Sequence, residues 1–121
     1  MAYATAIFND SRRSPNPNHP FTTKYFIYAI VTMYTRAFVE FLGTALIVGA
    51  FAFTQSPILI VAAVAIALGI GGKVSGGHFN PAITAFALAR GTIGTQRAMS
   101  YFVAQFGAAV LVFMLGSIIS V

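Results

Sequence analysis

Residues 75–97, SGGHFNPAITAFALARGTIGTQR, place a glycine-rich polar segment and a short apolar run inside a strongly hydrophobic chain. Gly76 and Gly77 permit extended or left-handed backbone conformations that other residues resist. Asn80 suits the N-cap of a helix, and Pro81 suits the first helical position, where its missing N–H costs nothing. The stretch therefore predicts irregular backbone that turns into a short helix beginning at Asn80.

The apolar run that follows is too short to cross a bilayer. It extends over residues 82–89, whereas a transmembrane helix needs about 20 residues. Irregular backbone at membrane depth is tolerated only where it is buried in protein or lines a water-filled cavity. We therefore expect a re-entrant loop and half-helix over residues 75–90, which enters the membrane and returns to the same side.

The segments on either side are long and apolar. Of the 121 residues, 58% are hydrophobic and 7% are charged, whereas about 25% of the residues of a soluble domain are charged. Because so few polar residues cannot cover a water-facing fold, the expected solvent is lipid. Spans are predicted at about residues 30–53, 58–74 and 98–121. The fold class predicted is an all-α membrane protein with three transmembrane helices and one re-entrant half-helix. The aromatic-rich residues 25–36 are interpreted as an interfacial stretch or an extension of the first helix.

The basic residues predict the topology. All seven lie before or at the start of the first span, or beside the connection between the second and third spans: Arg12, Arg13, Lys24, Arg36, Lys73, Arg90 and Arg97. With three spans, these positions share one side of the membrane, which the positive-inside rule makes the cytoplasm. The N-terminus is therefore expected in the cytoplasm, with residues 1–24 as a polar flexible tail, and the C-terminus on the opposite side. The sequence leaves open which membrane the chain occupies.

Few residues could support other chemistry. The chain has two acidic residues, two histidines and no cysteine, so neither a thiolate metal site nor a catalytic cluster is expected, and the chain is not predicted to be an enzyme. His78 has no second histidine or carboxylate beside it, and we interpret it as a structural hydrogen-bonding residue rather than a metal ligand. The basic residues are scattered, which argues against a nucleic-acid partner. No cofactor is predicted.

The re-entrant element itself indicates passive permeation. The carbonyl groups from Gly76 to His78 would point into a water-filled cavity as hydrogen-bond acceptors. The half-helix would direct its positive end, with the Asn80 amide, at a permeant. A file of water bound to such carbonyls can move, whereas a cation meets an electrostatic barrier.

Three motifs together resemble one family. The segment GGHFNPA, residues 76–82, followed by Ile83 and Thr84, is similar to the first pore loop of the aquaporin and glycerol-facilitator family, the major intrinsic proteins. The segment EFLGT, residues 40–44, resembles the first-helix motif of that family, and YFVAQFGAA, residues 101–109, resembles its third helix. The resemblance implies that residues 25–121 form one of two inverted repeats, and that the assembly is a tetramer.

The resemblance also implies pore roles for matching residues. The pore and selectivity residues would be Ile60, Gly76, Gly77, His78, Asn80, Pro81 and Ala82. Asn80 would be the first of two asparagines that donate to the permeant at the channel midpoint. Ile60 stands where many relatives have an aromatic residue or histidine, which points to a less polar filter.

Two polar residues would support the loop. By the same resemblance, Glu40 would accept hydrogen bonds from the re-entrant loop, and a carboxylate at membrane depth needs such partners on physical grounds. Glu40 could instead lie at the lipid–water interface beside Arg36. Gln105 would bond the third span to the loop or make a general interhelical contact.

The function expected is that of a passive channel half for water or small uncharged solutes, completed by a complementary inverted repeat or by other channel subunits. Two antiparallel copies are disfavoured, because all seven basic residues favour one orientation. The alternative is a non-conducting truncated relative that associates with full-length channels and modulates their assembly. The permeant, gating and oligomeric state stay open at this point.

Overall fold

The computed structural model describes residues 23–119, which contain four helices. These are α2 (Thr23–Phe53), α3 (Pro57–Ser75), α4 (Pro81–Ala89) and α5 (Thr95–Ile119). No strand occurs in this part of the chain. The chain divides into two compact units, residues 1–30 and 31–121; the first contributes the beginning of α2, and the contacts described below all lie in the second. The tail predicted for residues 1–24 lies almost entirely outside the described residues.

Three of the described helices are long and apolar enough to cross a membrane: α2, α3 and α5. Their large hydrophobic side chains are mostly exposed, as for Ile58 at 79% and Phe113 at 74%, and the buried hydrophobic residues are mainly alanines. This is the pattern of a protein whose solvent is lipid and whose helices approach closely through small residues. The predicted all-α membrane fold is confirmed.

Local sequence explains the helix boundaries. Helix α2 already begins at Thr23, so residues 25–36 are an extension of the helix, consistent with the absence of glycine and proline from residues 23–42. Pro57 begins α3, and at its other end Gly76 adopts a φ of +100° and donates its N–H to the Gly72 carbonyl at 2.9 Å. The side-chain oxygen of Asn80 accepts a hydrogen bond from the Ala82 N–H at 2.8 Å and caps α4.

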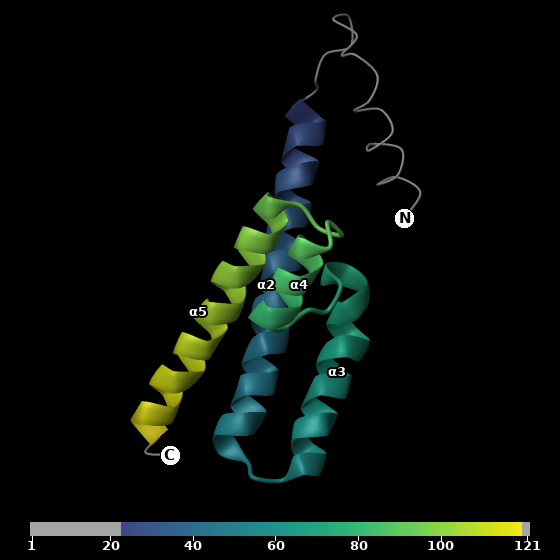
Figure 1. The fold of residues 1–121 in the computed structure, drawn as a ribbon. Coiled ribbons are helices and arrows are strands. Elements are labelled where there is room, and N and C mark those ends of the chain that lie inside the picture. The colour runs from purple at the N-terminus through teal and green to yellow at the C-terminus, as the bar shows by residue number, and fades with distance from the viewer. Residues whose placement is uncertain (1–22, 120–121) are drawn as a thin grey trace, which may run out of the picture. The chain divides into compact units, whose positions relative to one another are not determined.

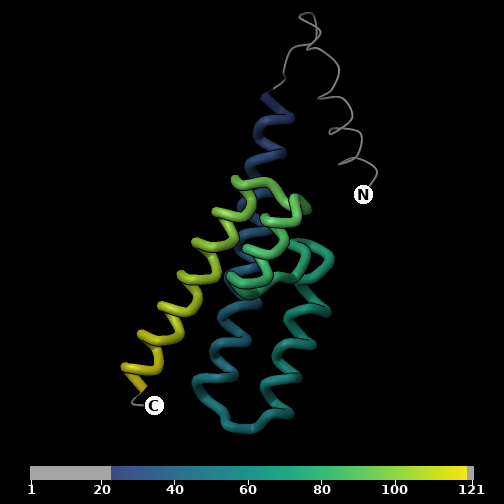
Figure 2. Tube along the Cα trace, viewed as in Figure 1, coloured from purple at the N-terminus to yellow at the C-terminus, as the bar shows by residue number. Residues whose placement is uncertain are grey.

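The nine-residue helix α4 follows a point where the chain folds back into the second unit. Figure 1 shows the chain folding back after α3, so that α4 begins part way along the neighbouring helices and returns toward the end where α3 ends and α5 begins. The Cα trace follows the same path, and α4 packs against α5 (Figure 2). The predicted half-helix is therefore present, and the loop that precedes it buries Gly77 and Phe79.

Candidate functional site

A fully buried carboxylate organises the interior of this unit. Glu40 is 0% exposed and accepts four hydrogen bonds from neutral donors. Its Oε1 accepts from the Ser75 hydroxyl at 2.6 Å and from the His78 N–H at 3.0 Å. Its Oε2 accepts from the Phe79 N–H at 2.5 Å and from Gln105 Nε2 at 3.0 Å. Hydrogen bonds to an ionised acceptor are the strong ones, and these four offset the cost of burying the charge.

This burial bears on the two interpretations of Glu40. An interfacial carboxylate would be exposed to solvent or lipid headgroups, whereas this one is enclosed by groups from α3, the re-entrant loop and α5. The burial therefore favours the loop-supporting interpretation of Glu40 over the interfacial one beside Arg36. Gln105 likewise makes a specific contact with Glu40 rather than a general one between helices.

A second layer of hydrogen bonds joins the half-helix to α5. Gln105 Nε2 also donates to the Thr84 hydroxyl at 2.8 Å, and Thr84 Oγ1 lies 3.0 Å from His78 Nδ1. The Tyr101 hydroxyl donates to the Ser75 carbonyl, and its ring meets the His78 ring edge to face with centroids 5.3 Å apart. One continuous network thus ties α2, α3, α4 and α5 together, so the position of the loop depends on all four helices.

The network sets the direction of the loop peptides. The N–H of Gly77 donates to Ser75 Oγ at 3.1 Å, and the next two N–H groups donate to Glu40. All described peptide bonds are trans, and in a trans peptide the N–H and the preceding carbonyl point in opposite directions. The carbonyl groups of Gly76, Gly77 and His78 are therefore turned away from Glu40.

Phe79 anchors the loop, although nothing in its sequence position singled it out. It is 4% exposed and adopts a φ of +48°, which is uncommon for a residue other than glycine. Its ring lies between α2 and α3, against Gly43 and Gly71. A Cβ added to Gly43 would lie 2.3 Å from Phe79 Cδ1, and one added to Gly71 would lie 2.8 Å from Phe79 Cζ. The ring fits only because both helices carry glycine there.

The predicted pore residues fall into two groups that lie at different positions along the helix axes. Asn80 and Ala82 are exposed at the inner end of α4, and the Asn80 amide N–H2 group has no hydrogen-bond partner among residues 23–119. Ile60 lies in the first turn of α3, 15 residues before Ser75 and thus about 22 Å away along the helix. The structure therefore groups Gly76, Gly77 and His78 with Glu40 and leaves Ile60 near the opposite end of the helix.

Four members of the network had not been expected from the sequence: Ser75, Phe79, Thr84 and Tyr101. Polar residues inside apolar segments are the signal that could have indicated Ser75 and Thr84. Among the described residues, no group of three histidine, cysteine or acidic residues could hold a metal ion.

Comparison with protein-family models matches residues 23–120 to the family described as Major intrinsic protein. The match includes all four helices and every residue of the Glu40 network. Searches among curated proteins and among solved structures gave no significant match.

Proposed function

The chain belongs to the major intrinsic protein family, whose members are channels, and from this premise we propose that it forms half of a passive pore for water or small uncharged solutes. A second, inverted repeat would complete the pore, and by analogy with the family four such pores would assemble in the membrane. The observation that carries this proposal is the Glu40 network, which holds the loop N–H groups inward and turns three consecutive carbonyls away from it.

The three carbonyls would act as successive acceptors for a permeant. At the end of this row lies the N-terminus of α4, where the helix dipole places partial positive charge and where the Asn80 amide is free to donate. A neutral molecule that both donates and accepts hydrogen bonds is well matched to this sequence of groups. A cation would be opposed by the helix end, so the expected transport is passive and cation-excluding.

Ile60 would contribute to selectivity at the other level of the pore. Its side chain is half-buried, apolar and unable to hydrogen-bond. A filter with an aliphatic side chain at this position should discriminate less strictly against solutes such as glycerol than one with histidine there. We therefore include small neutral solutes, and not water alone, in the proposed permeants.

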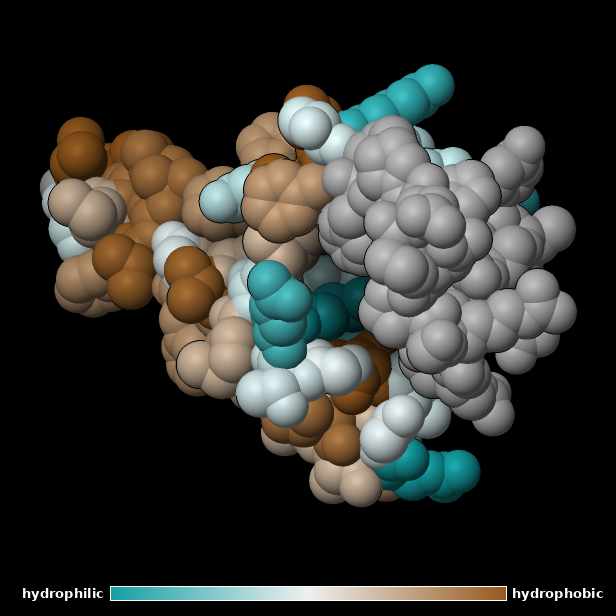
Figure 3. Space-filling view, turned by 90° about the horizontal axis from the view of Figure 1, so that it is seen from above, coloured by the Kyte–Doolittle hydropathy of each residue, from teal (hydrophilic) through white to brown (hydrophobic). Residues whose placement is uncertain are grey.

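The proposed orientation follows from the charges. Lys73, Arg90 and Arg97 flank the end at which α3 ends and α5 begins, whereas residues 54–57, at the opposite end, carry no charge. Seen from that first end, teal hydrophilic residues lie near the centre of the face and brown hydrophobic residues cover the visible flank (Figure 3). The positive-inside rule would place this end, and the N-terminus, in the cytoplasm.

The proposal is tested in proteoliposomes by stopped-flow light scattering. Liposomes that contain only this chain should shrink osmotically at the same rate as empty liposomes. The chain reconstituted with a second-repeat polypeptide, carrying its own Asn-Pro-Ala loop, should accelerate shrinkage several-fold. Asn80→Ala should reduce the acceleration, whereas Gln55→Ala, in the exposed turn between α2 and α3, should leave it unchanged. A glycerol gradient in place of a sucrose gradient identifies the permeant.

Two results would contradict the proposal in different ways. Rapid water flux through the chain alone would refute the need for a complementary half. Stable co-purification of the two halves without any flux would refute the pore and favour the non-conducting alternative, in which the chain modulates channel assembly.

A further inference from the structure

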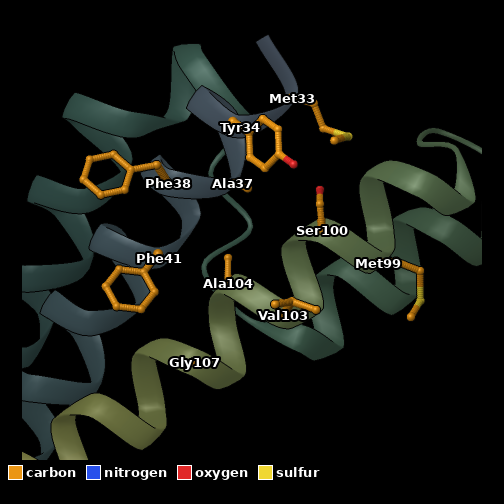
Figure 4. Close-up of a pocket in the computed structure, with 10 residues that line it drawn as sticks. All are labelled: Met33, Tyr34, Ala37, Phe38, Phe41, Met99, Ser100, Val103, Ala104 and Gly107. Carbon is orange, nitrogen blue, oxygen red and sulfur yellow. The ribbon is translucent and has the colours of Figure 1, made fainter. Parts of the chain in front are cut away.

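A groove between α2 and α5 lies outside the proposed pore. It has a volume of about 670 Å³ and is lined by residues between Met33 and Phe41 on α2 and between Met99 and Gly107 on α5 (Figure 4). The lining is apolar apart from the hydroxyl groups of Tyr34 and Ser100. Neither α3 nor α4 contributes to it, and none of the proposed pore residues lines it.

The dimensions of the groove match one leaflet of a bilayer. Eight residue steps of helix, from Met99 to Gly107, correspond to about 12 Å. The hydrocarbon core of a bilayer is about 30 Å thick, so the groove extends through most of one leaflet. Its walls combine aromatic rings, such as Phe38 and Phe41, with small residues such as Ala104, which leave room for a flexible aliphatic chain.

Two arginines lie close along the chain to residues that line the groove. Arg97 precedes Ser100 by three residues, and Arg36 follows Met33 by three, so each neighbours a lining residue on the same helix face. Both side chains are half-buried, and they belong to the two helices that line the groove.

Neither arginine has an acidic partner within residues 23–119. The single carboxylate side chain of that part of the chain is Glu40, which is already bonded to four neutral donors. Two half-buried guanidinium groups without a counter-ion favour an anion, and arginine is well suited to phosphate.

We propose that this groove binds an anionic phospholipid of the leaflet on the basic side, with one acyl chain between α2 and α5 and the phosphate at Arg97 and Arg36. The charge complementarity selects an anionic lipid over a zwitterionic one, and the cytoplasmic leaflet is the one rich in anionic lipid. This inference does not depend on conduction, because the groove and the proposed pore share no lining residue.

The test measures lipid binding by the full chain in detergent, using native mass spectrometry and thermal unfolding. Phosphatidylglycerol and phosphatidylcholine with identical acyl chains are compared, with inorganic phosphate as a third ligand. Phosphatidylglycerol should bind more tightly and raise the unfolding temperature more than phosphatidylcholine, and inorganic phosphate should have no effect. Arg97→Gln and Arg36→Gln should each lower phosphatidylglycerol affinity about fivefold, the effect of losing about 1 kcal/mol per basic residue. Arg90→Gln, on the exposed end of α4, is the matched control and should change nothing.

A second variant tests the acyl-chain site. Ala104→Phe fills the groove and should weaken binding of both lipids, while the Arg→Gln variants should affect only the anionic one. Equal binding of both lipids by the unaltered chain would overturn the proposal. Stabilisation by inorganic phosphate equal to that by phosphatidylglycerol would identify a free-anion site and also overturn it. So would an Ala104→Phe chain that remains folded and binds both lipids normally.

Discussion

Glu40 illustrates how one residue controls the proposed site. Its two oxygens each accept two hydrogen bonds, from donors that belong to α3, the loop and α5. A carboxylate is the only side chain of this size that offers four acceptor positions and no donor. Replacing it changes the loop as well as the helix that carries it, because two of the four donors are loop N–H groups.

Glu40→Gln should destabilise the protein and displace the loop. The side-chain NH2 group of glutamine would face two donors, from which it cannot accept hydrogen bonds. Leaving these buried groups unpaired costs on the order of 3 kcal/mol. Gln105→Leu removes one of the four donors to Glu40, and it should cost less. Thermal unfolding in detergent measures both effects. Equal unfolding temperatures for the unaltered protein and Glu40→Gln would contradict the assigned role of the network.

At the scale of elements, α2 and α3 approach the loop through glycines. Gly43 and Gly71 leave the space that the Phe79 ring occupies, whereas Gly69, on α3, and Gly116, on α5, have no atom within 4 Å of an added Cβ. The same residue type therefore serves two purposes in this bundle. At Gly43 and Gly71 the absence of a side chain leaves space for the Phe79 ring, whereas at Gly69 and Gly116 no neighbouring atom requires glycine.

Gly43→Ala should destabilise the protein by about 1–3 kcal/mol, because the added methyl group overlaps the ring of Phe79 in a packed interior. Gly69→Ala should instead stabilise it by up to about 1 kcal/mol, since alanine is the better helix former. Unfolding curves of the two variants provide the comparison. Combining Gly43→Ala with Phe79→Ala should restore part of the loss, and strict additivity of the two changes would disprove the contact.

At the scale of the whole molecule, the charge distribution governs insertion. The turn between α2 and α3 is uncharged, while the connection between α4 and α5 lies between Arg90 and Arg97. Moving that connection through the bilayer would carry basic residues with it, so one orientation should dominate.

Single-cysteine labelling tests this orientation, because the chain has no cysteine of its own. Gln55→Cys and Gln96→Cys introduce the same change at exposed positions, the first in the turn between α2 and α3 and the second in the first turn of α5. In intact cells, a membrane-impermeant maleimide should label position 55 and should reach position 96 only after permeabilisation. Labelling of both positions in intact cells would indicate dual topology, and would reopen the antiparallel homodimer as a pore.

Local patterns predicted a large part of the fold. The run over residues 82–89 is too short for a span, and the preceding segment GGHFNP contains both the residues that bend the chain and those that begin a helix. Cap geometry, helix length and hydropathy act within a few residues of chain or through the solvent, so they can be read without knowing any tertiary contact. The same patterns left the start of the first helix open, because residues 25–36 are helical in the structure without being apolar throughout.

By itself, the sequence determined that this chain is an all-α membrane protein with three spans and a half-helix that begins at Asn80. The tertiary structure alone decided which donors satisfy Glu40, where the Phe79 ring lies, and that Tyr101 holds the end of α3. The hydrogen bonds among these contacts join residues 26 to 65 positions apart. They depend on how four helices pack, and no local propensity encodes the partner of a side chain on another helix.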